Sequence, residues 1–153
     1  MQCDKCGSNK LSISFLEETI TIGKIIFRSV LPAKICTACG LSSFEIEMKS
    51  RFEKLVAVKL AMNGSVEPES FKFMRKIAGL SKAVLANVFD ISIEIIDDWE
   101  SSKTKIDWYY VALLGAIVLD KIQNNSTTTL DRLRAYRNLS IETDISIRTI
   151  EVV

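Results

Sequence analysis

The chain has 153 residues, of which 48% are hydrophobic and 25% are charged, and its formal net charge is +1. This composition predicts a folded protein with one domain of ordinary size or two small ones, and the charge gives no electrostatic case for nucleic-acid binding by the whole chain. The longest apolar stretch, residues 108–119, is too short to span a bilayer and carries no secretory pattern, so we expect a soluble, cytoplasmic protein.

Two Cys-x-x-Cys pairs, each followed directly by glycine, lie in the first part of the chain, and the sequence contains no histidine. Such a pair suits a tight turn that directs two thiolates at one ion, and the glycine permits a positive φ. Two pairs predict a tetrahedral site for one structural zinc ion, since four thiolates leave no open position for catalysis. The alternatives are two disulfides or two redox-active pairs, and a disulfide framework is typical of small secreted domains. The predicted zinc ligands are Cys3, Cys6, Cys36 and Cys39.

The segment between the cysteine pairs has the pattern of a β-ribbon. Residues 11–15 alternate apolar and polar like a half-buried strand, and residues 19–22 and 25–27 predict a hairpin that turns near Gly23. We expect Pro32 to end this ribbon. Residues 1–43 are therefore predicted to form a small zinc-ribbon-like domain, in which the metal supplies much of the folding free energy.

A linking helix is predicted over residues 44–64, because apolar residues recur there at spacings of three and four. It should end at Asn63-Gly64-Ser65, where we place a domain boundary. The apolar face of this helix comprises Phe44, Met48, Phe52, Leu55, Val56 and Leu60.

Residues 65–123 predict an all-α domain of four or five short helices. Pro68 lies near the first position of the first helix, and Ser81, Ser92 and Asp107 are candidate N-caps for the next three. The last helix is apolar over much of its surface, which is typical of a core helix or a dimer face. The overall prediction is an α+β protein: a zinc-pinned β-ribbon, then a helical domain, then an extended tail.

The tail, residues 124–153, ends in apolar residues that alternate almost strictly and read as a strand with no obvious partner. Such a strand either pairs with a sheet edge of its own chain or of a dimer mate, or docks on another protein by strand addition. The candidate partner-binding residues are Leu139, Ile141, Ile145, Ile147, Ile150 and Val152.

The stretch from Met74 to Asp107 resembles a helix-turn-helix of the Xre/Cro type. Leu85 and Ala86 match the apolar and small residues at its helix crossing, and Trp99-Glu100-Ser101 followed by Lys103 resembles its closing W-E-x-G-x-K motif. The order of cysteine pairs, ribbon, linking helix and this module, over roughly residues 1–123, resembles the YgiT-type zinc-finger/helix-turn-helix antitoxins, the MqsA-like family. The resemblance implies that the zinc domain neutralises a toxin protein, and that the helical domain forms a homodimer and represses its operon.

Two features depart from that family. Asp90 stands where the turn usually has glycine, although aspartate tolerates the left-handed conformation better than most residues. Residues 90–100, which include the expected recognition helix, hold five carboxylates and no cation, whereas a DNA reader normally presents Arg, Lys, Asn or Gln there. Carboxylates oppose the phosphate contacts that dominate affinity for DNA. The remaining candidates for DNA contact are Lys82, Ser92, Lys103 and Lys105.

These features favour an antitoxin, with a DNA-binding autorepressor as the alternative function. An enzyme is not expected, because the chain has no histidine, no nucleotide-binding loop and no cysteine outside the predicted zinc set. Some antitoxins that resemble this chain carry a C-terminal extension recognised by a SecB-like chaperone. The resemblance therefore extends to a toxin–antitoxin–chaperone assembly, in which residues 124–153 would be the chaperone-binding segment.

Overall fold

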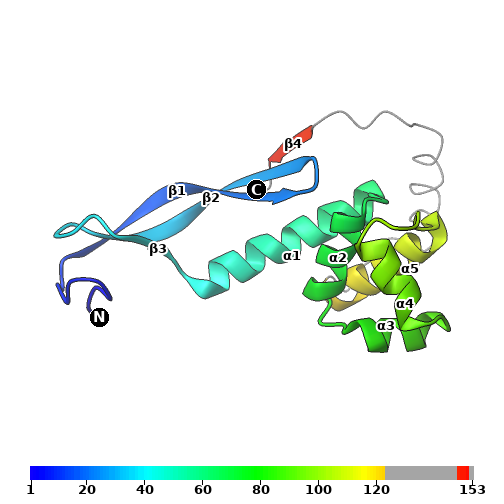
Figure 1. Cartoon of the computed structure of the whole chain (residues 1–153). Helices are drawn as coiled ribbons and strands as arrows, with labels where there is room; N and C mark the ends of the chain where they lie inside the picture. The colour runs from blue at the N-terminus through cyan, green and yellow to red at the C-terminus, as the bar shows by residue number, and fades with distance from the viewer. Residues whose placement is uncertain (123–147, 152–153) are drawn as a thin grey trace.

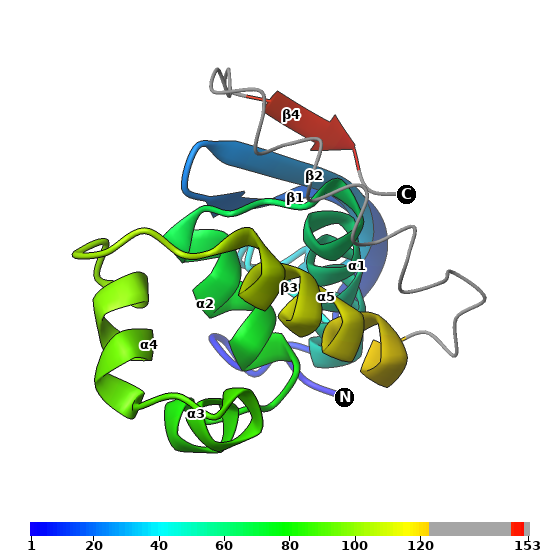
Figure 2. The same cartoon turned by 90° about the vertical axis from the view of Figure 1, so that its right-hand side faces the viewer.

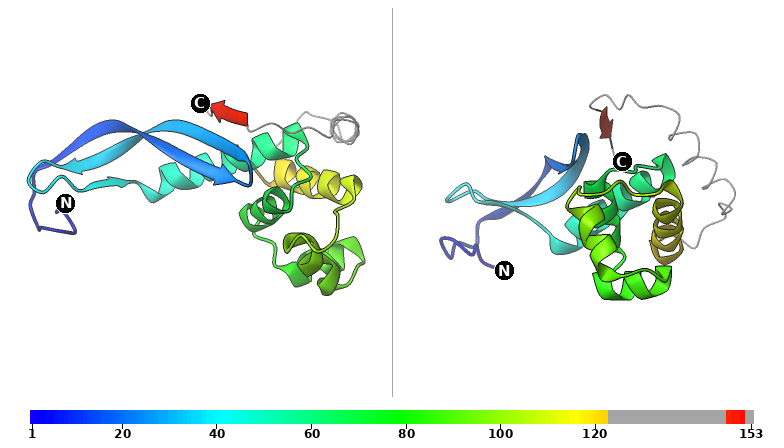
Figure 3. Two further views of the ribbon diagram at one scale, coloured as in Figure 1. Left: turned by 45° about the horizontal axis from the view of Figure 1, so that its top comes forward. Right: turned by 45° about the vertical axis from the view of Figure 1, so that its right-hand side comes forward.

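The computed structural model describes residues 1–122 and 148–151, and its fold is α+β. In these residues a long antiparallel ribbon precedes five helices, and the open end of the ribbon and the start of the first helix extend away from the other four helices (Figures 1 and 3). The N-terminus lies at the far end of the ribbon from the helices (Figure 1). Among the described residues, no helix combines the length and the apolar character needed to cross a membrane.

Strands β1 (Leu11–Ile22) and β2 (Ile25–Cys36) pair along their entire length. They are joined by the two-residue turn Gly23-Lys24, and Gly23 adopts a φ of +56°, which a glycine allows at no steric cost. The segments expected over residues 11–15 and 19–22 are therefore parts of one strand, β1, of a single continuous hairpin. This hairpin carries Cys36 at the end of β2, opposite Leu11.

Pro32 does not end the ribbon, contrary to the prediction. It lies within β2 opposite Phe15, and the strand continues to Cys36. The two-residue turn makes Ile22 and Ile25 a hydrogen-bonded pair. Hydrogen-bonded and non-hydrogen-bonded pairs alternate along the hairpin, so Phe15 and Pro32 form a non-hydrogen-bonded pair. The backbone nitrogen of Pro32 therefore faces away from β1. On that side, neither β3 nor β4 pairs with residue 32, so the missing N–H breaks no ladder bond.

The alternation over residues 11–15 predicts a strand correctly but assigns the wrong face to the core. Ile13 and Phe15 are exposed, whereas Leu16 and Ile20 are half-buried and Ile22 is buried. The apolar residues of β1 change from odd to even positions after Phe15. The even set packs inward because Ile22 and its neighbours fix the register at the turn, and the odd set then points outward.

After the second cysteine pair, a short strand that was not predicted, β3 (Ser42–Phe44), pairs antiparallel with β2. Helix α1 (Ile46–Asn63) follows and ends at Gly64, which has a φ of +68° and donates its N–H to Leu60. The end of α1 agrees with the sequence signal. Its beginning lies two residues later than expected, because Phe44 belongs to β3.

Residues 65–122 form four further helices, where the sequence predicted four or five. Pro68 occupies the first turn of its helix, and Asp90 adopts the left-handed conformation, with φ 54° and ψ 45°, in the turn between the second and third of them. The helices are α2 (Pro68–Ile77), α3 (Lys82–Phe89), α4 (Ile93–Glu100) and α5 (Trp108–Ile122).

One hydrophobic core joins the turn end of the ribbon to the helices. Helix α1 packs against α5, and α2 packs against both. Phe27 of β2 is fully buried in the same cluster as Phe52 of α1 and Phe71 of α2. The cysteine end of the ribbon contributes nothing to this cluster, so its order depends on other interactions.

Two serines at helix N-caps provide a matched pair of substitutions. The Oγ of Ser81 accepts a hydrogen bond from the N–H of Val84 at 3.1 Å, whereas Ser92 occupies the N-cap of α4 without a side-chain capping bond. We expect Ser81→Ala to lower the free energy of unfolding by about 1 kcal/mol and Ser92→Ala to lower it by clearly less. Urea denaturation of the two variants measures this difference, and equal losses would contradict it.

The C-terminal strand β4 (Arg148–Glu151) pairs parallel with β2, so that Arg148 lies opposite Ile25 and Ile150 opposite Phe27 (Figure 2). The strand therefore lies on the ribbon of its own chain, one of the arrangements expected for the tail. The other candidate tail residues lie outside the described residues: Leu139, Ile141, Ile145, Ile147 and Val152.

Candidate metal centre

Each cysteine pair is held in a compact turn, and the two turns share one hydrogen-bond pattern. In the first, Cys3 donates its N–H to the carbonyl of Ser8 at 2.9 Å, and Gly7 donates to the carbonyl of Cys3 at 2.8 Å. In the second, Cys36 donates to Leu41 at 2.9 Å and Gly40 donates to Cys36 at 2.8 Å. Both glycines have a positive φ, +68° and +73°, which explains why each pair is followed by glycine.

The ribbon brings the two turns together. Lys10, just before β1, accepts hydrogen bonds on its carbonyl from the N–H and the Oγ1 of Thr37, at 3.0 and 3.2 Å. These bonds link the segment after the first turn to the second turn directly. Because Leu11 and Cys36 are paired across the ribbon, the register of the hairpin also sets the distance between the two cysteine pairs.

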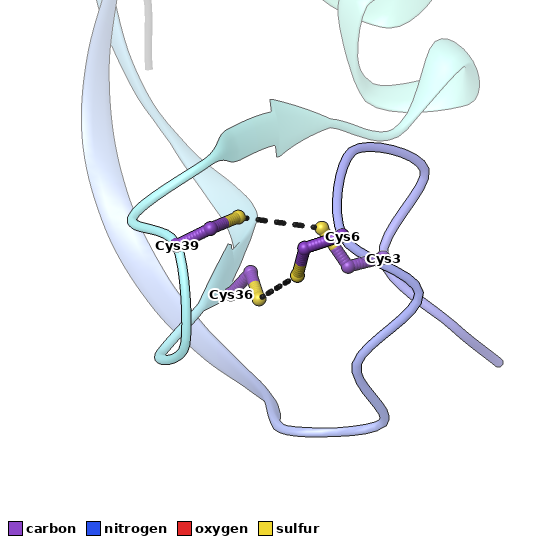
Figure 4. A group of neighbouring side chains, drawn as sticks. All are labelled: Cys3, Cys6, Cys36 and Cys39. Carbon is purple, nitrogen blue, oxygen red and sulfur yellow. Dashed lines mark hydrogen bonds between the residues drawn. The ribbon is translucent and has the colours of Figure 1, made fainter.

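The four sulfur atoms point toward a common centre (Figure 4) and all lie within 4.8 Å of one another. The Sγ atoms of Cys3 and Cys39 are 3.6 Å apart, as are those of Cys6 and Cys36. A disulfide requires about 2.05 Å, and all four cysteines are free. A tetrahedral ion with metal–sulfur bonds of about 2.3 Å requires sulfur separations of about 3.8 Å. The cluster is therefore compact enough to hold a metal ion.

Two thiols of the cluster differ in how readily they ionise. Burial of Cys36 opposes its ionisation, but backbone N–H groups of Cys39 and Ala38 outweigh this effect and lower the pKa of the Cys36 thiol to about 7. At Cys6, the N–H of Ser8 also favours the thiolate, yet the neighbouring thiols of Cys39 and Cys36 outweigh it and raise the pKa to about 12. The protein thus favours the thiolate at Cys36, whereas at Cys6 a bound metal ion would have to replace the proton of the thiol.

A pocket of about 500 Å³ lies beside the cluster, between the first cysteine turn, β3 and the start of α1. Leu41, Phe44 and Ile46 provide apolar walls, and Lys34, which forms an ion pair with Glu45 at 2.8 Å, lies on its border. Cys3 and Cys36 are also among the lining residues. The shape of this pocket therefore depends on the fold of the cysteine turns.

The candidate DNA-contacting residues lie on or near α3 and α4, and two of the three lysines contact acids. Lys82 forms a hydrogen-bonded ion pair with Asp97, which is the main cause of its raised pKa. The Nζ of Lys103 is 3.5 Å from a carboxylate oxygen of Asp98. Ser92 and Lys105 are exposed. The acids of α4 therefore neutralise part of the small positive charge at this surface.

One charged pair of the helical region was missed by the sequence reasoning. Arg75 of α2 donates two hydrogen bonds to Glu100 of α4, at 2.6 and 3.0 Å, and a third to the carbonyl of Leu80 at 2.8 Å. The side chains of Arg75 and Glu100 are only 8% and 3% exposed. The available signal was the position of Arg75, four residues after Phe71, which places the two side chains on the same face of α2.

Comparisons with models of protein families, with curated proteins and with solved structures gave no match to this chain. The resemblance to antitoxins therefore rests on the motifs of the sequence and on the order of its elements.

Proposed function

We propose that this protein is an antitoxin that binds a toxin protein through an N-terminal module stabilised by one structural zinc ion. The observation that carries the proposal is the four-cysteine cluster at the end of a long ribbon that projects from a helical unit (Figures 1 and 4). Four thiolates suit zinc and leave no position for substrate, so the metal would have a structural role. The pocket beside the cluster and the exposed ribbon offer surface for a partner.

The zinc part of the proposal is tested by metal analysis of protein purified without chelator. We expect one zinc ion per chain, and loss of this ion in the Cys6→Ser variant. Ser43→Ala is a suitable control, because Ser43 lines the neighbouring pocket but provides no thiolate. Protein that carries no zinc, or a redox-active iron centre in its place, would contradict the proposal.

The antitoxin part is tested by co-expression with the products of the genes that neighbour the gene for this chain. We expect one neighbouring protein to arrest growth when expressed alone, and this chain to restore growth and to co-purify with it. The Cys6→Ser variant should lose both effects, whereas Ser92→Ala, at an exposed position of the helical region, should keep them. Neighbouring proteins that are all harmless, or rescue without a complex, would refute the assignment.

The alternative function is a DNA-binding autorepressor. Its support is the helix-turn-helix arrangement of α3 and α4, with Asp90 in the left-handed conformation at the turn. The acids of α4 oppose this function, since they replace the cations that usually contact phosphates. We therefore propose repression only as the second activity of the same chain.

The contribution of the acids can be measured directly. The double variant Asp97→Asn, Asp98→Arg should bind DNA of the upstream region more tightly than the native chain, because it removes two negative charges and adds one cation. A salt series of gel shifts measures the change. The variant Glu53→Arg, at an exposed position of α1, is a control for the net charge of the chain. Nanomolar, sequence-specific binding by the native chain at physiological salt, lost on changing Asp98, would overturn this interpretation.

The third part of the proposal concerns residues 124–153. We propose that a SecB-like chaperone recognises this segment in an extended form. Deleting them should raise solubility and lifetime in cells that lack the chaperone, without loss of toxin binding. The measurement is the half-life of the full and truncated chains after synthesis is stopped. If the truncated chain is less stable, the pairing of β4 with β2 is the role of the tail and the chaperone hypothesis fails.

A further inference from the structure

The outer face of the ribbon carries an apolar patch that no helix covers in the described part of the chain. Ile13, Phe15 and Val30 are 74%, 71% and 62% exposed. Phe15 lies opposite Pro32, and Val30 lies opposite Glu17, which places all of these side chains on one face of the hairpin. We call Ile13, Phe15, Val30 and Pro32 the outer patch.

The same part of β1 also has free backbone groups. Among the described strands, β1 pairs only with β2, so it forms an edge of the sheet. Because Ile22 and Ile25 close the hairpin as a hydrogen-bonded pair, the N–H and C=O groups of the odd-numbered residues of β1 point away from β2. Ile13 and Phe15 therefore combine exposed apolar side chains with unpaired backbone groups, a combination that proteins normally cover.

We propose that a second copy of this chain covers this edge, with the two β1 strands antiparallel about a two-fold axis near Phe15. Such a pairing joins odd-numbered residues to odd-numbered residues, so both outer patches lie on the same face of the combined sheet. Phe15 then lies beside Phe15 of the second copy, an aromatic cross-strand pair. A two-fold axis makes the contact self-complementary and closed, which limits the assembly at this edge to two chains.

The charges of β1 favour this register over its neighbours. The strand contains two acids, Glu17 and Glu18, and no cation. Pairing centred on Phe15 places Glu17 opposite Ile13, and Glu18 opposite Ser12, of the second copy. Pairing centred on either glutamate would place like charges opposite each other, which destabilises a sheet.

Within each chain, the acids of β1 already have cationic partners. Glu17 forms an ion pair with Arg28 at 3.4 Å, and Glu18 forms one with Lys49 at 3.3 Å. The edge is therefore close to neutral and does not repel an identical edge. A basic partner strand would gain little from these acids, which favours a second copy over a foreign cationic segment.

Sedimentation equilibrium of the full, metal-loaded chain tests the proposal. We expect the native chain to form dimers and the Phe15→Lys variant to dissociate at least about tenfold more readily, because it places two cations together at the axis. Thr21→Lys is the matched control: it adds the same charge to the same face of β1, yet Thr21 lies beyond the overlap of two strands centred on Phe15. This control should dimerise like the native chain.

Phe15→Thr is a second variant, which keeps the β-propensity of the strand and removes the ring, in case lysine disturbs the fold. Metal content and circular dichroism establish that each variant is folded. A native chain that is monomeric would overturn the proposal, as would folded Phe15 variants that dimerise unchanged, since these would assign the dimer to the helices. A monomeric native chain that needs Phe15 to bind the toxin would assign the patch to the toxin instead. The measurements of dimer formation do not depend on the proposed antitoxin activity.

Discussion

Removal of the metal should unfold the cysteine end of the ribbon while the helices remain folded. The two cysteine turns are held by a few backbone hydrogen bonds and contribute no side chain to the main core. Binding of a structural zinc ion is worth about 10–16 kcal/mol at neutral pH, far more than such bonds supply. The turn end of the ribbon should stay in place, because Ile22 and Phe27 are buried in the core that it shares with the helices.

Hydrogen exchange after chelation measures this effect residue by residue. We expect loss of protection in the cysteine turns and the adjoining half of the ribbon, with protection retained from Ile22 to Phe27. Both tryptophans, Trp99 and Trp108, lie in the helices, so their fluorescence is an internal control and should not change. A simultaneous change in the tryptophan fluorescence would show that the metal holds the whole chain together, and full protection without metal would show that the metal is dispensable.

Replacing Arg75 by alanine should lower the free energy of unfolding by about 3–5 kcal/mol. The substitution leaves the carboxylate of Glu100 buried without its main partner, and the desolvation penalty of such a charge is large. It also leaves the carbonyl of Leu80 without the donor that ties the start of the α3 segment to α2. Thermal or urea unfolding followed by circular dichroism measures the loss.

Two further variants separate the buried pair from ordinary surface charge. Lys82→Ala removes a cation that also approaches Glu100, at 3.7 Å, but Lys82 is partly exposed, so we expect a loss of no more than about 1 kcal/mol. The double variant Arg75→Met, Glu100→Leu should recover most of the stability lost in Arg75→Met alone, because it leaves no buried charge unpaired. Equal losses in Arg75→Ala and Lys82→Ala would refute this account.

The sequence predicts features that follow from local chemistry. The spacing of the cysteines and the glycines after them predict both turns, because a metal site of this kind needs two thiolates per turn and a positive φ. The end of α1 at Gly64 and the start of α2 at Pro68 are equally local signals.

The features that were missed depend on the register of the ribbon and on contacts between distant segments. The face of β1 that enters the core is set at the turn, several residues from Ile13 and Phe15, so alternation over five residues could not identify it. The ribbon tolerates Pro32 because its nitrogen faces the side of β2 on which no described strand pairs with residue 32. The contact of Arg75 with Glu100 spans two helices, and neither residue has a neighbour in sequence that indicates its partner.

The position of β4 on β2 has a consequence for biosynthesis. The segment Ile25–Arg28 leaves the ribosome long before its neighbour Arg148–Glu151, because more than a hundred residues separate them in the chain. At about 5–20 residues per second, this edge of the ribbon stays unpaired for on the order of ten seconds in every nascent chain. During that interval the hairpin, the cysteine turns and the helices can already form, and the last strand is added to a sheet that is otherwise complete.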